Sequence, residues 1–274
     1  QNLCYNLFKS VQNYSMCIIS GGVNMVSYER MSKILDILSK RKMISTIQLE
    51  SLMFCSTSTL RRDLIQLEKD GKIIRTHGEV RLVTTNNVEY TYESRKQEET
   101  SGKKYIAETA STFLTDNQSI FIDSSSTAAM LVPYLANLQN LRVITNGLEI
   151  ARQLNNYDNI TLFFCGGHID YGTNSALGDF ANHFINNFHA DICFMSCRGL
   201  DRFGSYEANY NQALLKQQMI ANSDLTVLLA DSSKFHTSHY FKLANYNVID
   251  YIITNEAPVE SFQDTVNKQC EILW

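Results

Sequence analysis

The sequence predicts an α/β protein with two domains: a small N-terminal winged helix-turn-helix domain and a larger domain on a mainly parallel sheet. The chain has 274 residues, more than one compact core usually accommodates. Apolar residues make up 44% and charged residues 19%, which is ordinary for a globular protein. The division into two domains follows from a change of charge along the chain and from strand-like runs in its second part.

The charge changes sign along the chain. Residues 29–83 hold 11 Lys/Arg against 7 Asp/Glu, whereas residues 84–274 hold 12 against 21. A basic region ahead of an acidic one indicates that the first part binds a polyanion and the second does not. Chance variation of surface charge would give the same pattern, so the charge alone leaves both interpretations open.

The seven cysteines are odd in number, scattered and without a CxxC pair. We therefore expect a cytoplasmic protein with neither a disulfide framework nor a zinc site. His236 and His239 have no carboxylate or cysteine at ligand spacing, so we expect no metal. The sequence also lacks a glycine-rich nucleotide loop, so we expect no cofactor.

The N-terminal stretch carries few charges. Residues 10–28 have none, but polar residues and the Gly21-Gly22 pair interrupt the stretch, which excludes a spanning helix or a signal peptide. Residues 21–25 can be encoded as a ribosome-binding site ahead of a start codon. We therefore expect residues 1–24 to be a non-native or disordered extension, with translation beginning at Met25. The codons of the gene test this hypothesis.

Apolar residues at helical spacing predict three helices in residues 25–84. The first spans residues 28–40, and the second follows Ser45, which forms a capping box with Gln48. Ser56 caps the third helix and Gly71 ends it.

Two extended runs at residues 72–76 and 80–84 then predict a β-wing. The polar residues of the third helix cluster in its N-terminal turns, the part of a recognition helix that meets base edges. Arginine pairs with guanine edges, and wing cations contact phosphates. The DNA-binding candidates are Ser56, Thr57, Ser58, Thr59, Arg61, Arg62, Lys72, Arg75 and His77. Three ordinary helices with a solvated Arg-Arg pair would show the same spacing.

Six apolar runs alternate with helical stretches in the second domain, residues 103–274. Because polar residues do not alternate within them, the runs predict strands buried on both faces, hence a mainly parallel sheet covered by helices. The runs are residues 119–122, 141–145, 160–164, 192–196, 225–230 and 248–254. Residues 85–102 are polar and are expected to form an irregular linker.

Four of these runs end in polar or glycine-containing turns. Ligands of parallel sheets bind at the carboxyl ends of the strands, and N–H groups at a helix start hold phosphate. Each turn alone is more often an ordinary strand end, but four at equivalent ends favour a ligand site. The candidates are Asp123, Ser124, Ser125, Ser126, Thr127, Asn146, Gly147, Gly166, Gly167, Asp231 and Lys234, the last supplying positive charge.

Several segments of both domains form a recognisable pattern. In the first domain these are Ser56–Leu64, Leu67–Gly71 and Arg75–Gly78, and in the second they include residues 123–127, 145–147, 166–167, 199–201 with Gly204, and 231–235. With these segments both domains resemble the DeoR family of bacterial transcriptional regulators. Phe54, Glu79, Ser125, Ser126 and Gln212 depart from the family pattern. The resemblance implies a second domain folded like sugar-phosphate isomerases, a phosphorylated sugar as effector, and Lys216 as a further site residue.

We therefore expect a repressor of a sugar-metabolism operon that binds operator DNA as a dimer or tetramer, is controlled by a phosphorylated sugar, and has no membrane partner. The alternative is an isomerase-like enzyme with an accessory DNA-binding domain, for which Asp123, Asp231 and Lys234 are the only catalytic candidates. Because an attached DNA-binding domain favours sensing, we predict no enzymatic activity and no catalytic residue.

Overall fold

The computed structural model describes residues 27–41, 43–53, 55–76, 78–83, 90–266 and 270–274. The chain divides into two compact units, residues 1–83 and 84–274. The expected extension at residues 1–24 and the DNA-binding candidate His77 lie outside the described residues.

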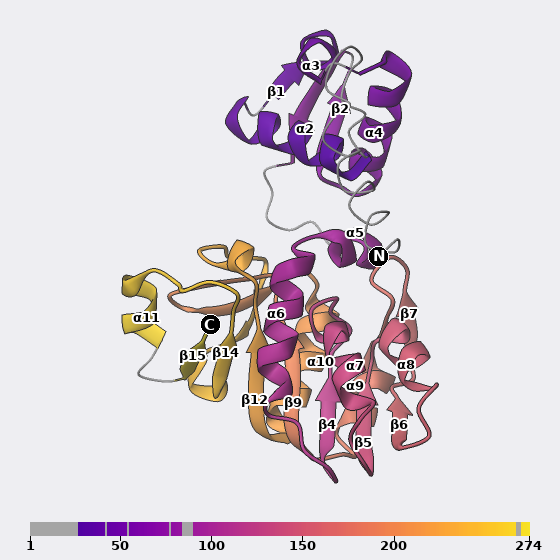
Figure 1. Cartoon of the computed structure of the whole chain (residues 1–274), viewed down its shortest axis with the longest axis vertical. Helices are drawn as coiled ribbons and strands as arrows, with labels where there is room; N and C mark the ends of the chain where they lie inside the picture. Colours follow the sequence, from indigo (N-terminus) through magenta and orange to yellow (C-terminus); the bar gives the residue numbers. More distant parts are fainter. Residues whose placement is uncertain (1–26, 42, 54, 77, 84–89, 267–269) are drawn as a thin grey trace, which may run out of the picture. The chain divides into compact units, whose positions relative to one another are not determined.

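In the N-terminal unit the described residues form the three predicted helices and a three-stranded antiparallel sheet (Figure 1). The helices are α2 (Ser27–Arg41), α3 (Thr46–Met53) and α4 (Thr57–Lys69). The strands, in the order β1-β3-β2, are β1 (Met43–Ser45), β2 (Ile73–Thr76) and β3 (Glu79–Leu82). The sequence predicted only two of them, because β1 has three residues and no alternating pattern.

The predicted helix ends are confirmed. Ser45 Oγ accepts a hydrogen bond from the Gln48 amide at 3.2 Å, and Ser56 Oγ accepts one from the Thr59 amide at 3.3 Å. Past the end of α4, Gly71 adopts a φ of 69°, a left-handed conformation that favours glycine. Local side-chain chemistry therefore fixes where α4, the predicted recognition helix, begins and ends.

A buried ion pair joins α2 to α4. Asp63 is 4% exposed, and its carboxylate accepts hydrogen bonds from Arg30 Nε at 2.7 Å and from Ser27 Oγ at 3.0 Å. Around it packs an apolar core of Ile34, Leu38, Ile44, Leu49, Met53, Leu60, Leu64, Leu67, Ile73 and Val80. The pair ties α4 to α2, and the sequence analysis did not predict it.

Asp63→Asn is expected to lower the free energy of unfolding of this unit by about 2 kcal/mol, because hydrogen bonds to a charged group contribute about 1.5–3 kcal/mol. Hydrogen exchange of α4 amides across a urea series measures the change. Asp70→Asn, at the C-cap of the same helix, is the control. A loss below about 0.5 kcal/mol, typical of surface substitutions, would contradict the role given to the pair.

The C-terminal unit is built on a seven-stranded sheet in the order β15-β14-β12-β9-β4-β5-β6, with every neighbouring pair parallel (Figure 1). The strands are β4 (Ser119–Ile122), β5 (Leu141–Thr145), β6 (Ile160–Phe164), β9 (Ala190–Ser196), β12 (Ser223–Leu229), β14 (Tyr251–Ile253) and β15 (Glu271–Leu273). Six of them confirm the predicted runs, and β15 is additional.

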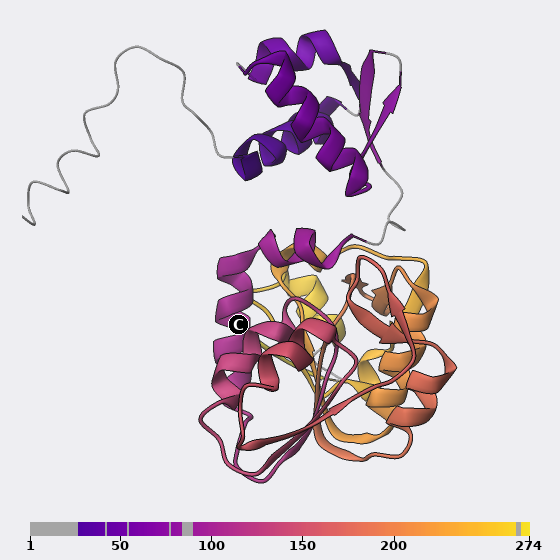
Figure 2. The same cartoon turned by 90° about the vertical axis from the view of Figure 1, so that its right-hand side faces the viewer.

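Helices cover both faces of this sheet (Figure 2). One face packs on α6 (Thr100–Ser111), the 3-10 turn η1 (Ala128–Leu131), α7 (Val132–Leu135) and α8 (Leu148–Leu154). The other packs on α9 (Asp179–Ile185), α10 (Tyr210–Ala221) and α11 (Glu260–Val266). The predicted α/β class with a mainly parallel sheet is thereby confirmed.

Smaller elements lie at the ends of the strands. They are the hairpin β7 (His168–Asp170) and β8 (Ser175–Leu177), the sheet of β10 (Gly199–Asp201), β11 (Gly204–Glu207) and β13 (Phe241–Ala244), and the turns η2 (Ser232–Lys234) and η3 (Tyr246–Val248). The sequence analysis did not predict these short strands, although Gly199 and Gly204 had been singled out.

Residues 85–102, expected to be irregular, contain the helix α5 (Tyr92–Gln97) and the first turn of α6. Thr91 caps α5 through the Ser94 amide, and Tyr92 is 2% exposed. The expectation was wrong because the polar composition of this region gave no indication that Thr91 caps a helix or that the aromatic Tyr92 is buried. The linker region is thus folded from Tyr92 onward as part of the C-terminal unit.

Candidate functional site

The predicted effector residues lie at one edge of the seven-stranded sheet. Parallel strands bring their carboxyl ends together, so the turns after β4, β5, β6 and β12 meet at this edge. Asp123 follows β4, Asn146 and Gly147 follow β5, Gly166 and Gly167 come after β6, and Asp231 and Lys234 come after β12. The structure therefore brings together the four turns that the sequence singled out.

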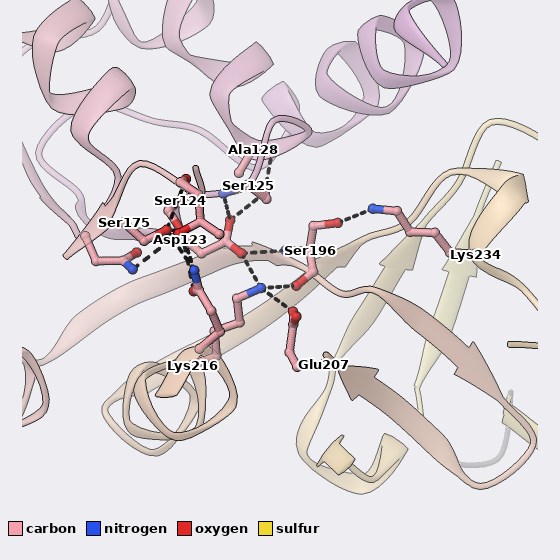
Figure 3. A network of polar contacts seen from close by, with 12 residues as sticks. Asp123, Ser124, Ser125, Ala128, Ser175, Ser196, Glu207, Lys216 and Lys234 are labelled. Carbon is pink, nitrogen blue, oxygen red and sulfur yellow. Dashed lines mark hydrogen bonds and ion pairs between the residues drawn. The ribbon is translucent and has the colours of Figure 1, made fainter. Parts of the chain in front are cut away.

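The centre of this edge is a buried cluster of three charges (Figure 3). The Lys216 ammonium, carried by α10, lies 2.8 Å from Asp123 Oδ2 and 2.5 Å from Glu207 Oε1. It also donates to the Ser196 carbonyl at 2.8 Å, so its three N–H groups all have partners. The cluster joins the ends of β4 and β9 to α10 and β11.

The Asp123 carboxylate organises the loop that follows it. One oxygen accepts from the Ser125 amide at 3.1 Å and the Ser125 hydroxyl at 2.5 Å, and the other accepts from the Ser196 amide at 3.1 Å. Burial alone would raise the pKa of Asp123, but the charge and hydrogen bonds of Lys216 hold that pKa below its ordinary value. The same pairing raises the pKa of Lys216 despite its burial. Both groups are therefore charged at neutral pH.

Ser124 lies in a second network of neutral groups. Its hydroxyl accepts from Ser175 Oγ at 2.7 Å, and Ser175 Oγ accepts from Gln212 Nε2 at 2.7 Å (Figure 3). Gly147, two residues after β5, packs against Ser124, since a Cβ there would stand 3.0 Å from the Ser124 main chain. Ser124 and Gly147 thus sit in main-chain contact, which explains why a glycine follows Asn146.

Several polar atoms at this edge are buried without a protein partner. Among the described residues these include Thr127 Oγ1, Asn146 Oδ1 and Thr254 Oγ1, in residues at most 1% exposed. Thr254 follows β14 and was missed by the sequence analysis, which counted it as the last residue of the predicted run 248–254. Buried polar atoms of this kind are satisfied by water or a ligand in most proteins.

Lys234 is a second cation at this edge, and it is less enclosed than Lys216. Its ammonium donates to Ser196 Oγ at 2.7 Å and stands 3.6 Å from Asp231 Oδ2, and the side chain is 14% exposed. Burial alone would raise the pKa of Asp231, but the charges of Lys234 and Lys103 and the hydrogen bonds of Ser233 together hold that pKa below the ordinary value. Gly166 and Gly167 are exposed in the segment after β6, the strand at the far edge of the sheet. An anion at this edge would lie near the positive charge of Lys234 and near hydroxyl and amide groups that can donate hydrogen bonds.

This arrangement is poorly suited to proton abstraction. A general base works best with a pKa near neutrality, whereas the pKa values of Asp123 and Asp231 are both held below the ordinary carboxyl value. The oxygens of Asp123 are also occupied by Lys216, Ser125 and Ser196. The carboxylates of the edge instead hold cations and main chain in place.

The DNA-binding candidates divide by exposure. Thr57, Ser58, Arg61 and Arg62 are exposed on α4, whereas Thr59 is half-buried. Arg62 Nε donates back to the Ser58 carbonyl at 3.3 Å, and Thr57 Oγ1 donates to Glu50.

The remaining candidates lie at the helix start and on the wing. Ser56 serves as the cap of α4, and Lys72 is half-buried. Arg75 pairs with Glu68 at 3.6 Å. An exposed helix start bearing two arginines therefore stands beside a basic wing, as a DNA-reading unit requires.

The described part of the chain holds no group of three His, Cys, Asp or Glu side chains able to bind a metal ion. None of its helices is long and apolar enough to span a membrane.

A winged helix-turn-helix unit joined to an α/β unit with an anion-attracting sheet edge defines a ligand-responsive transcriptional regulator. Residues 30–86 match the family model of the DeoR-like helix-turn-helix domain, and residues 98–256 match that of the DeoR C-terminal sensor domain. The chain belongs to the DeoR family and is a DNA-binding transcriptional regulator.

Its relatives include the uncharacterized HTH-type regulator YulB of Bacillus subtilis, with 32% identity over 88% of this chain and 95% of the relative. The glycerol-3-phosphate regulon repressor of Escherichia coli is 27% identical over 85% of this chain and 93% of its own. Among solved structures, ribose 5-phosphate isomerase A of Neisseria gonorrhoeae is similar, with a TM-score of 0.37, 16% identity, and coverage of 49% of this chain and 53% of that chain.

Proposed function

We propose that the protein represses a sugar-metabolism operon and that a phosphorylated sugar or polyol, bound at the carboxyl edge of the sheet, controls it. The observation that carries this proposal is Lys234, a cation facing an edge with three buried, unpartnered polar atoms. A relative is named as the repressor of a glycerol-3-phosphate regulon, which supports a phosphorylated effector.

Each predicted effector residue has a role in this proposal. Lys234 attracts the phosphoryl group, while Ser124, Ser125, Ser126 and Thr127 surround it from the loop after β4. Asn146, Gly147, Gly166 and Gly167 contact the sugar from the neighbouring strand ends. Asp123, Lys216 and Asp231 form the charged base that holds the loop and Lys234 in place. No residue of the set is assigned a catalytic role.

On the DNA side, the operator bases are read by the exposed residues of α4, which are Thr57, Ser58, Arg61 and Arg62. The remaining candidates support α4 or contact the DNA backbone; they are Ser56, Thr59, Lys72, Arg75 and His77. Helix-turn-helix proteins usually read repeated half-sites, so we propose a dimer or tetramer. A regulator of this kind acts on bacterial DNA, so we place it in the cytoplasm.

Fluorescence anisotropy tests the whole proposal. Labelled DNA from the region upstream of this gene is titrated with the full chain, with and without glucose 6-phosphate, fructose 1-phosphate and glycerol 3-phosphate. Salt-dependent binding that prefers this DNA over random DNA, and that one of these phosphates changes, is the expected result. No preference in any condition would contradict it, and sugar-phosphate isomerisation would then be assayed.

Arg61→Ala is expected to weaken binding to the upstream DNA about ten- to hundredfold, because a base contact contributes about 1–3 kcal/mol of discrimination. Binding to random DNA should change much less. The same titration measures both, and Lys69→Ala in the last turn of α4 is the control. If Arg61→Ala leaves affinity and sequence preference unchanged, α4 does not read DNA through this residue.

A further inference from the structure

Lys103 is a buried lysine that none of the roles above uses. Its side chain starts in the first turn of α6 and is 3% exposed. The ammonium donates one hydrogen bond to the Glu98 carbonyl at 2.6 Å and another to the Arg95 carbonyl, both at the carboxyl end of α5. A cation stabilises the carboxyl end of a helix, so Lys103 holds α5 in place from the neighbouring helix.

The same turn of α6 is linked, through Asn255, to the loop that carries Lys234. Gly102 packs on the Asn255 side chain, since a Cβ at this position would stand 3.0 Å from Asn255 Cγ. Asn255 Oδ1 in turn accepts from the Ser232 amide at 2.9 Å. A continuous series of contacts therefore runs from α5 to the loop that carries Lys234. Lys103 binds the end of α5, its neighbour Gly102 touches Asn255, and Asn255 accepts a hydrogen bond from the Ser232 amide.

We propose that Lys103 is the positioning residue that couples effector binding at Lys234 to the helix α5, through which the chain leaves for the DNA-binding unit. This inference rests on the proposed function and adds the route by which ligand binding is transmitted. Without ligand, the buried ammonium has main-chain carbonyls as hydrogen-bond partners and faces a second cation. An anion at Lys234 offsets that repulsion, stabilises the charged form of Lys103, and thereby tightens its hold on α5.

The charges around Lys103 support this direction. Burial first, and then repulsion from Lys234, lower the pKa of Lys103 to about 8, while Asp231 and Glu98 raise it and Arg95 lowers it. The position of α5 also depends on Tyr92, which is buried and donates its amide to the Gly172 carbonyl at 2.5 Å. Because coupling between sites is reciprocal, a ligand that tightens α5 binds better when α5 is held.

The first test compares two neighbouring lysines of α6. Lys103→Met removes the buried charge at nearly constant length, and Lys104→Met removes an exposed charge one residue further on. Anisotropy gives the ratio of upstream-DNA affinities with and without glucose 6-phosphate, fructose 1-phosphate or glycerol 3-phosphate. The change in affinity caused by the phosphate should shrink about fivefold or more, toward a ratio of 1, in Lys103→Met and stay as in the wild type in Lys104→Met.

The second test uses the wild type and does not depend on the stability of a variant. Above about pH 7 a phosphate monoester is already a dianion, so a change in affinity at higher pH reports on the protein. Calorimetry should give about tenfold weaker binding of the active phosphate at pH 9 than at pH 7, as Lys103 loses its proton. Lys103→Met should lack this dependence. Amide exchange of α5 should also slow on ligand addition in the wild type alone.

The possible results separate the two proposals. A wild type that responds to none of the phosphates overturns the proposed function, and this inference with it. A wild type and a Lys103→Met variant that respond equally, with the same pH dependence, overturn only the role of Lys103. Loss of the response in Lys103→Met alone, together with loss of the pH dependence, supports it.

Discussion

Lys216→Met is expected to lower the free energy of unfolding of the C-terminal unit by about 3–5 kcal/mol, because removing one partner of a buried ion pair leaves an uncompensated charge. Methionine preserves the length of the side chain, so the loss comes from charge and hydrogen bonding. Asp123 and Glu207 would then face each other's charge without the ammonium that lies 2.8 Å from one and 2.5 Å from the other. Urea unfolding followed by circular dichroism measures the change.

Two further variants make this prediction specific. Lys242→Met, at an exposed lysine on β13, is the control and should cost less than about 0.5 kcal/mol. Combining Lys216→Met with Asp123→Asn and Glu207→Gln removes the unpaired charges and should recover part of the loss. If Lys216→Met is as stable as Lys242→Met, the cluster does not hold the sheet edge together.

The same cluster predicts how stability depends on pH. Lys216 keeps the pKa of Asp123 below the ordinary carboxyl value of about 3.9, so this contribution is present above that pH and is lost as pH falls through the lower, folded-state pKa. In Lys216→Met, burial instead raises the pKa of Asp123. The acid unfolding midpoint of the variant, followed by circular dichroism, should therefore lie at a higher pH than that of the wild type. Equal midpoints would show that Lys216 does not set the pKa of Asp123.

The elements predicted well from the sequence are those whose signal is local. The strand β4 has the bounds predicted for it, Ser119–Ile122, because the three buried apolar residues that follow Ser119 leave a clear run in the sequence. The caps at Ser45 and Ser56 were predictable because a capping side chain acts on an amide three residues away. The turns of the effector edge were predictable because every parallel strand ends on the same side of the sheet.

The parts that were missed depend on residues far apart in the sequence. Glu207 gave no signal, because its partner Lys216 lies on α10 and the two meet only through the fold. Asp63 follows Arg61 and Arg62 directly in the sequence, yet it is buried against Arg30 on another helix. Lys103 stood at the end of what looked like a linker. In each case tertiary pairing decides whether a charged residue is solvated or enclosed.

Lys234→Ala is expected to weaken binding of the active sugar phosphate about ten- to hundredfold, because a hydrogen bond to a charged group contributes about 1.5–3 kcal/mol. Calorimetry with glucose 6-phosphate, fructose 1-phosphate and glycerol 3-phosphate measures the change, and Lys242→Ala on the neighbouring β13 is the matched control. The buried cluster at Lys216 does not contact Lys234 directly, so the overall fold should be retained. Unchanged affinity for the active phosphate would argue strongly against the site.

Measuring DNA binding in addition to phosphate binding tests the same prediction more stringently. A ligand shifts a regulator only by the difference in its affinity for the two states, so a variant that does not bind the phosphate cannot be switched by it. Lys234→Ala should therefore lose the effector response because binding is lost. Lys103→Met should lose it mainly because the response no longer reaches α5. Measuring ligand affinity and DNA response on both variants separates a residue that receives the phosphate from one that transmits its arrival.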